Sequence, residues 1–210
     1  MPTRTARQVG RPTRAEAARL DESIRAAAIA AFIARGFDGV TMEDVARTAQ
    51  VGKPALYARY PDKAALFTAV VPWALQNLNW ELDGVPDDLD LRAALLHVGR
   101  ATLERATDPE MVGLFRMAMA ESPRFPEVAL TADEVTRSPL VAPVRELLER
   151  HRAAGEIDVD DVELAAEHFI ALVHLTPLTF AAFGFERDRA QGEEFLRRTV
   201  DLFLHGAQTR

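Results

Sequence analysis

Four side chains suited to binding nucleic acid lie close together in the chain, at Lys53, Tyr57, Arg59 and Lys63. Lys53 and Lys63 are the two lysines among the 25 basic residues of the sequence. A lysine ammonium is a compact charge that suits a phosphate, and a guanidinium or a phenol can donate a hydrogen bond to the edge of a base. The residue types and their spacing therefore predict contacts to a duplex, with phosphates bound at both ends and bases between them.

A short helix is predicted over residues 42–49, just before these side chains. Its apolar residues recur with the 3.6-residue period of a helix, at Met42, Val45, Ala46 and Ala49. Thr41 and Asp44 have the spacing of a capping box, which satisfies free amides at a helix N-terminus. Gln50, Val51 and Gly52 alone separate this helix from the next, so the connection must be a sharp turn.

A second helix is predicted to open with Lys53 and Pro54, because proline is tolerated in a first turn, where amides have no intrahelical partner. We expect Leu56 and Tyr60, four residues apart, to pack against the first helix. The outward face then holds Pro54, Ala55, Tyr57, Ala58 and Arg59. Small residues allow such a helix to approach another surface closely, and a helix of this kind fits the major groove of DNA.

Residues 20–75 resemble the tetracycline-repressor family of transcriptional regulators. The resemblance rests on three stretches, RGFDGVT, MEDVARTAQV and LYARYPDKAALF. It implies an all-helical homodimer, with an N-terminal three-helix helix-turn-helix domain that binds DNA and a larger C-terminal helical domain for effector binding and dimerisation. It also implies that the family's DNA contacts fall on Thr41, Lys53, Pro54, Tyr57, Arg59 and Lys63. Arg11, Ala55 and Tyr60 complete our set of candidate DNA contacts.

Two positions depart from the pattern of that family. The family usually places glycine where Gln50 stands in the turn, and serine or a similar N-cap where Gly52 stands. A turn displaced by one residue would accommodate both departures.

The amino-acid composition restricts the kinds of protein to which this chain can belong. With 210 residues, 48% of them hydrophobic, the chain can bury a core and form one small and one larger domain. The absence of cysteine excludes disulfides, thiolate metal sites and thiol catalysis. We find neither a signal peptide nor an apolar run of about 18 residues, so we expect a cytoplasmic protein without a membrane partner.

Charge is distributed unevenly along the chain. The formal net charge of −7, taken alone, argues against a nucleic-acid partner. Residues 1–63, however, contain 11 basic and 7 acidic residues and carry +4, which leaves −11 for the remainder. This asymmetry favours DNA binding by the first part of the chain and keeps the second part away from DNA.

We divide the chain into a flexible basic arm over residues 1–19, a helix-turn-helix DNA-binding domain over 20–65 and an effector-binding and dimerisation domain over 66–210. The arm contains the sequence Gly10-Arg11-Pro12. Two descriptions of it are compatible: a disordered, solvated tail in the free protein, and a segment that orders on DNA in a narrow A·T minor groove.

The remaining helices of the DNA-binding domain can be outlined from their apolar residues. A first helix is expected over residues 21–35 and should end at Gly36. Its expected buried stripe is Ile24, Ala27, Ala28, Ala31 and Phe32. Phe37 is expected to pack beneath the DNA-binding helices. Asp62 should cap a fourth helix, and Pro72 should kink it.

From residue 87 onward, helical patterns follow one another without the period-two alternation of strands. We expect helices near residues 90–107, 109–121, 125–135, 138–154, 160–183 and 187–206. Residues 163–183 are apolar nearly all round, so this helix should be buried on more than one side. The predicted fold class is therefore all-α.

A small-molecule pocket in this second part is suggested by the resemblance more than by residue spacing. The candidate lining residues are Trp73, Trp80, Leu103, Met111, Phe115, Met119, Phe169, Leu172, His174 and Phe180. His174, Arg116 or Thr176 would orient a ligand, while an ordinary core role remains the alternative for each candidate. The apolar, aromatic and methionine-containing lining favours a hydrophobic or amphipathic effector.

The last helix has more apolar residues than one buried face requires. The resemblance implies that the final two helices pair with their symmetry mates in a four-helix interface. The candidate interface residues are Leu164, Leu175, Phe195, Thr199, Leu202 and Phe203. Burial within one subunit is the alternative. A two-fold dimer requires a DNA site that is an inverted repeat.

The five histidines do not have the spacing of a helical metal site, and the sequence contains no HExxH motif. His168 and His174 lie on the apolar helix and are more simply explained as hydrogen-bonded core residues. No glycine-rich phosphate loop or GxSxG nucleophile is present. We therefore expect neither an enzyme nor a protein that needs a metal or another cofactor.

These observations favour a homodimeric repressor that holds a palindromic operator until a small hydrophobic effector releases it. Two alternatives remain open. One is a helical module that binds a small molecule or a protein partner without a specific operator. The other is a transcriptional activator of the same architecture, because the direction of regulation depends on where the DNA site lies.

Overall fold

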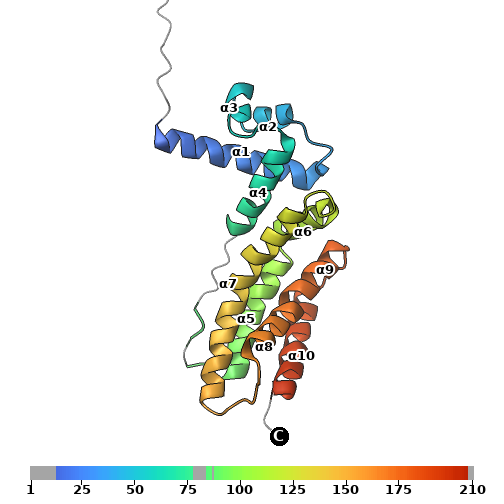
Figure 1. Ribbon diagram of the computed structural model, residues 1–210. Coiled ribbons are helices and arrows are strands. Elements are labelled where there is room, and N and C mark those ends of the chain that lie inside the picture. Colours follow the sequence, from blue (N-terminus) through green and yellow to red (C-terminus); the bar gives the residue numbers. More distant parts are fainter. Residues whose placement is uncertain (1–12, 78–83, 87, 208–210) are drawn as a thin grey trace, which may run out of the picture. The chain divides into compact units, whose positions relative to one another are not determined.

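The computed structural model of the protein describes residues 13–77, 84–86 and 88–207. Every regular element within these residues is a helix (Figure 1). The chain divides into two compact units, one ending at Val70 and the other beginning at Val71. The predicted all-α fold class is confirmed.

The N-terminal unit contains α1 (Arg14–Arg35), α2 (Met42–Thr48), α3 (Lys53–Tyr57) and the first part of α4 (Lys63–Asn77). Helix α1 begins earlier than the predicted residue 21, because Thr13 and Glu16 form a capping box. Residues 14–19, which we had assigned to a flexible arm, are thus the first turns of this helix. The rest of the predicted arm, including Arg11, lies outside the described residues.

Three phenylalanine rings form the centre of the N-terminal unit. The ring centroids of Phe32 and Phe67 are 5.2 Å apart, those of Phe37 and Phe67 are 5.2 Å apart, and those of Phe32 and Phe37 are 6.0 Å apart. All three side chains are buried, so the predicted burial of Phe37 is confirmed, and the rings that it contacts belong to α1 and α4. The predicted stripe of α1 is buried except at Ala31, which is half-buried, while the neighbouring Ile29 is buried instead.

The turn between α2 and α3 keeps its position despite the two unusual residues. Gln50 has φ of 56°, and it is the single non-glycine residue with positive φ among the described residues. Gly52 is the N-cap of α3 and provides no side-chain hydrogen bond. The chain therefore adopts a left-handed conformation where the resembled family has glycine, rather than displacing the turn.

The C-terminal unit consists of the end of α4 and the helices α5 (Leu91–Ala106), α6 (Pro109–Glu121), α7 (Pro126–Ala153), α8 (Val162–Ile170), η1 (Ala171–Leu175), α9 (Thr176–Ala182) and α10 (Arg189–Ala207). Helix α5 packs against α7, η1 and α10, and α7 packs against α8. Figure 1 shows α8, η1 and α9 following one another as a continuous helical run.

One predicted feature of this unit is wrong. Residues 126–153 form the single helix α7, although we expected a break at Pro139. Pro139 removes one amide, but the helix continues because Leu140, Val144 and Leu148 are buried on its packed face. The helix expected over 160–183 is confirmed as the run of α8, η1 and α9, and it contains a π-helical segment, in which the amide of Thr176 donates to the carbonyl of Ala171.

The π-helical segment has a local cause in the sequence. Pro177 has no amide proton, and its ring would clash with the carbonyl of Val173 in a regular α-helix. Widening the turn before the proline relieves that clash, and the Thr176 hydroxyl also donates to Ala171 O at 3.0 Å. The segment carries His174, so the widened turn determines where this imidazole lies.

The run Val162–Ala182 is long and apolar enough to cross a membrane by length and composition alone. The helix of a buried core passes the same test, and 44% of the most apolar window of this run is buried inside the protein. The run is therefore weak evidence for a membrane span.

The conformation of Gln50 leads to a prediction about stability. A left-handed conformation costs an L-residue roughly 1 to 2 kcal/mol, whereas glycine adopts it freely but loses more entropy on folding. Because the Gln50 side chain is exposed, we expect Gln50→Gly to raise the free energy of unfolding by about 0.5 to 1 kcal/mol. Urea denaturation followed by circular dichroism measures this change. Gln50→Ala, which retains a Cβ atom, is the control and should not stabilise; equal effects of the two substitutions would contradict the explanation.

Candidate functional site

The entry to α2 is built as predicted. The Thr41 hydroxyl accepts a hydrogen bond from the Asp44 amide at 3.1 Å, and the Asp44 carboxylate accepts one from the Thr41 amide at 3.3 Å. The hydrogen bond with the Thr41 side chain is the main cause that keeps the pKa of Asp44 below its usual value. Asp44 also pairs with Arg35 and Arg47. These contacts fix α2 relative to the end of α1.

Helix α3 presents the side chains expected on its outward face. Leu56 is fully buried and Tyr60, just past the helix, is 8% exposed, whereas Tyr57 is 42% exposed. Pro54 and Lys53 are exposed at the first turn. The predicted packed face is therefore confirmed, and the predicted free face is confirmed at Pro54, Tyr57 and Ala58, whereas Ala55 and Arg59 are half-buried.

Tyr60 was predicted both to pack inside and to contact DNA. Its ring is buried, and its hydroxyl accepts a hydrogen bond from Arg25 Nε at 3.3 Å. The ring therefore anchors the chain after α3 to α1, and any contact with DNA would be limited to the hydroxyl. Ala55, another candidate DNA contact, is half-buried, and its carbonyl accepts a hydrogen bond from Arg59.

Each cation around α3 has a partner within the protein. Lys53 Nζ lies 3.1 Å from the Glu43 carboxylate, and the hydrogen bond from Lys53 is the main cause that lowers the pKa of Glu43. Arg59 Nε donates to Asp21 on α1. Lys63 Nζ donates to the Phe37 carbonyl at 2.9 Å and lies 4.4 Å from the centre of the Phe37 ring.

Lys63 lies in the first turn of α4, as predicted. The Ala65 amide donates to the Asp62 carboxylate at 2.8 Å, so Asp62 caps this helix. An ammonium has three donors, and the bond to Phe37 uses one of them. Lys63 can therefore hold its carbonyl partner and still bind a phosphate.

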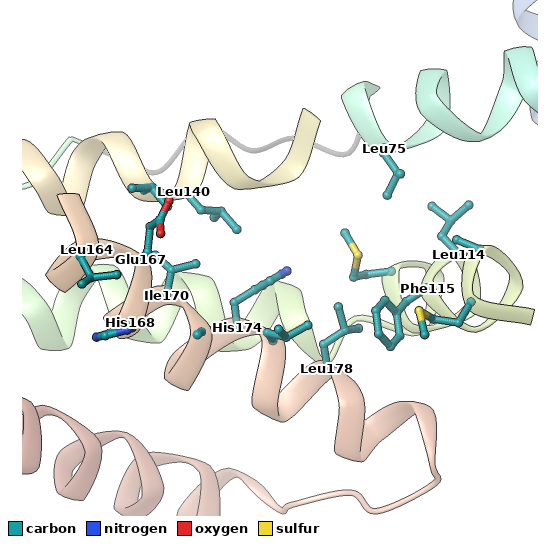
Figure 2. Close-up of a pocket in the computed structure, with 16 residues that line it drawn as sticks. Leu75, Leu114, Phe115, Leu140, Leu164, Glu167, His168, Ile170, His174 and Leu178 are labelled. Atoms are coloured by element: carbon teal, nitrogen blue, oxygen red, sulfur yellow. The ribbon is translucent and has the colours of Figure 1, made fainter. Parts of the chain in front are cut away.

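A cavity of about 490 Å³ lies in the C-terminal unit. Its lining residues are Leu75, Met111, Leu114, Phe115, Ala118, Met119, Leu140, Val141, Leu164, Glu167, His168, Ile170, Ala171, His174, Leu175 and Leu178. In Figure 2, Glu167 and His168 lie toward one end, Leu75 and Leu114 lie toward the other, and His174 lies between them. The cavity is thus mostly apolar, with its polar groups on α8 and η1.

Four of the predicted ligand residues line this cavity: Met111, Phe115, Met119 and His174. The other lining residues on α6 and on the α8–η1–α9 run were missed. Five of them lie three or four residues from one of those four, so extending each predicted helical face would have found Leu114, Ala118, Ile170, Ala171 and Leu178. Leu140 and Val141 belong to α7, and no signal in the sequence links them to this cavity.

The remaining predicted ligand residues have other surroundings. Phe169 is fully buried, with its ring centroid 5.2 Å from that of Phe203. Leu103 faces Gly192 of α10, and Phe180 is partly exposed with its ring edge against Phe185. Three further candidates do not line the cavity: Leu172 lines a second hollow, Trp73 is half-buried on α4, and Trp80 lies outside the described residues.

The two polar groups that were expected to assist His174 are engaged elsewhere. Arg116 donates to the carbonyls of Ala181 and Ala182 at 2.9 and 2.6 Å and so caps the end of α9. The Thr176 hydroxyl donates to the backbone of η1. His174 itself is buried, and burial lowers the pKa of its imidazole to about 4, against a smaller opposing effect of the Thr102 backbone. His174 is therefore neutral at pH 7.

The predicted interface residues differ in exposure. Leu164, Leu175 and Leu202 are exposed. Phe195 and Phe203 are half-buried, and Thr199 is buried and donates to the Phe195 carbonyl at 2.9 Å. Leu202 and Phe203 line a second hollow of about 600 Å³ together with residues of α8 and η1.

No group of three or more histidine, aspartate or glutamate side chains in the described part of the chain could hold a metal ion. The described geometry instead consists of an outward-facing short helix in one unit and an apolar cavity in the other.

Two parts of the chain match the models of known protein families. Residues 24–70 match the family model for bacterial regulatory proteins of the tetR family, and residues 93–206 match that for the AefR-like transcriptional repressor C-terminal domain. No curated protein matches the chain.

Several solved structures are similar. A putative TetR-family transcriptional regulator from Mesorhizobium loti is 26% identical, with a TM-score of 0.77, over 94% of this chain and 100% of that one. The flavonoid-responsive regulator FrrA is 27% identical, with a TM-score of 0.74, over 92% and 98%. FadR from Bacillus subtilis, in complex with stearoyl-CoA, shares the fold at 16% identity, with a TM-score of 0.65, over 89% and 98%.

The buried histidine leads to a prediction about pH. An unfolded histidine takes up a proton below pH 6.5, whereas folded His174 remains neutral until about pH 4. Protonation therefore favours the unfolded chain as the pH falls through this window, and His174 should cost roughly 3 kcal/mol of stability near pH 4. Urea unfolding at a series of pH values tests this.

The variant His174→Gln should lose stability less steeply between pH 6.5 and 4 than the wild type does. His205→Gln, which replaces an exposed histidine, is the control and should follow the wild type. A His174 imidazole that titrates near pH 6.5 by NMR would contradict this account.

Proposed function

The chain belongs to the tetR family of bacterial regulatory proteins, and we propose that it is a homodimeric repressor that a small hydrophobic effector releases from a palindromic operator. The observation that carries this proposal is the exposed face of α3. Tyr57 is exposed there, Lys53 begins the helix, and Arg59 and Lys63 follow it in the chain. A cytoplasmic location is part of the proposal.

The side chains around α3 suit a duplex. The exposed phenol of Tyr57 can donate to a base or a phosphate, and the small Ala58 beside it allows a close approach to the groove. Lys53 is the first residue of this helix and Lys63 follows it at the start of α4, so the two suit the phosphates on either side. Thr41, at the N-cap of α2, and Pro54 complete the proposed contact surface.

The cavity in the C-terminal unit supports the effector part of the proposal. Its volume of about 490 Å³ lies within the usual range for small-molecule sites, and its lining combines apolar residues with a few polar groups. Methionines 111 and 119 would adapt to ligands of different shape. The relative FrrA, described as flavonoid-responsive, supports a response to a small molecule in this chain too.

The dimer part of the proposal rests on exposed apolar side chains of the last helices. Leu164, Leu175 and Leu202 are exposed on α8, η1 and α10. A second copy that packs its own α8 and α10 against them would remove this surface from water. Two DNA-binding units related by a two-fold axis would then require an inverted repeat.

Release from DNA follows if the effector binds better to a dimer whose two α3 helices cannot reach both half-sites. The effector then shifts the population away from the DNA-bound state, and the operator must weaken effector binding by the same factor. Helix α4 is suited to transmit this coupling, because Lys63 lies in its first turn and Leu75 lines the cavity. Pro72 within this helix is the expected site of a kink.

Selection of bound sequences from random DNA tests the proposal. We expect a palindrome to be recovered, with the same half-site preference at two salt concentrations. Salt-sensitive binding without a preferred sequence would contradict an operator-specific regulator and favour the alternative, a helical small-molecule-binding module. A transcriptional activator of the same architecture would also recover a palindrome, and reporter expression from a promoter that carries the site distinguishes activation from repression.

Substitution of Lys63 should weaken DNA binding without regard to sequence. Because its proposed partner is a phosphate, Lys63→Ala should lower affinity for operator and scrambled duplex alike and reduce the slope of log affinity against log salt by about one. Tyr57→Ala should instead weaken operator binding more than scrambled binding. Arg152→Ala, which removes an exposed arginine of the C-terminal unit, should leave the slope unchanged. An unchanged slope for Lys63→Ala would remove Lys63 from the proposed surface.

A further inference from the structure

Arg59 is held more tightly than Lys53, and its anchor is the side chain of an acidic residue rather than the backbone carbonyl that holds Lys63. Its Nε donates to the Asp21 carboxylate and its Nη1 donates to the Ala55 carbonyl at 3.1 Å. The Arg59 side chain is 25% exposed, against 60% for the side chain of Lys53. Two acceptors on different helices thus restrain one guanidinium at the end of α3.

Asp21 is itself held in place relative to the end of α3. Arg25, one turn further along α1, donates to the Tyr60 hydroxyl at 3.3 Å. Ser23, between them, donates to the Ala49 carbonyl at the end of α2 at 3.1 Å. The contacts of Asp21, Ser23 and Arg25 therefore fix this segment of α1 against α2 and the residues after α3, so the backbone that carries the Asp21 carboxylate has a set position.

The restrained guanidinium still has donors to offer. Arginine has five N–H groups, and the bonds to Asp21 and Ala55 account for one on Nε and one on Nη1. Both hydrogens of Nη2 and the second hydrogen of Nη1 can still bind a phosphate or a base acceptor. Arg59 can therefore bind DNA while Asp21 continues to hold it.

The restraint on Arg59 affects the binding of specific and of nonspecific DNA differently. A free arginine on a long side chain can follow a phosphate on any sequence, and phosphate contacts carry no sequence information. A restrained arginine binds well only where the duplex places an acceptor at its fixed position, and there it loses little side-chain entropy. The negative charge of Asp21 also weakens the attraction of this surface to every nearby phosphate, so a site must recover affinity through the contact with Arg59.

We infer that Asp21 is a specificity-determining residue, which acts through Arg59 by lowering affinity for nonspecific DNA more than affinity for the operator. This inference rests on the proposed function, because it requires an operator. Asp21 is a positioning residue and need not touch the DNA itself.

Paired substitutions on α1 test the inference. Asp21→Ala removes both the charge and the acceptor, while the adjacent Glu22→Ala removes the same charge from an exposed side chain of the same helix. Affinity is measured for the selected operator and for a scrambled duplex of equal length, and thermal melting checks that each variant is folded. We expect Asp21→Ala to lower the ratio of operator affinity to scrambled affinity about tenfold. Glu22→Ala should change both affinities alike and keep the ratio within about twofold.

A double-mutant cycle tests whether Asp21 acts through Arg59. In an Arg59→Ala background, Asp21→Ala should leave the ratio unchanged. The inference is overturned if Asp21→Ala raises both affinities equally, because Asp21 is then a simple repulsive charge. The inference is also overturned if Asp21→Ala still lowers the ratio of operator affinity to scrambled affinity in the Arg59→Ala background. Equal wild-type affinity for operator and scrambled duplex would instead overturn the proposed function, and this inference with it.

Discussion

A helix of five residues is not stable by itself in water, because the free energy cost of nucleating a helix exceeds the stabilisation from the hydrogen bonds of one turn. Helix α3 has this length, so its position depends on the burial of Leu56 and Tyr60 against its neighbours. In the same unit, Phe32, Phe37 and Phe67 join α1, the following turn and α4 into one core. The outward direction of Tyr57 is a consequence of that packing.

The charges of the N-terminal unit are arranged around the same short helix. Lys53 pairs with Glu43 at the surface, and such exposed pairs contribute little to stability, so DNA can displace this contact at low cost. Arg59 and Lys63 are held by Asp21 and by the Phe37 carbonyl. Of these three cations, one is easily exchanged and two have positions that are set before DNA binds, which reduces the entropy lost on binding.

Local patterns in the sequence predicted local structure well. The capping box of Thr41, the packed face at Leu56 and the bounds of α6 follow from side chains within one or two turns of each other. The unbroken α7 and the π-helical segment were missed because packing outweighs the cost of Pro139 and because a π turn has no periodic signal of its own. About half the residues that line the cavity lie on helical faces that extend from predicted residues. The lining residues of α7 and the contact between Asp21 and Arg59 bring together positions far apart in the chain, and local patterns do not reveal such contacts.

The central claim is that α3 presents Tyr57 to DNA while Tyr60 stays in the core. The chain has two tyrosines, one exposed and one buried, so incorporation of 3-fluorotyrosine gives one fluorine probe for each. On addition of the selected operator, the fluorine resonance of Tyr57 should shift much more than that of Tyr60, and a scrambled duplex should shift it less. A Tyr57 resonance that does not respond to the operator under conditions of full binding would contradict the account.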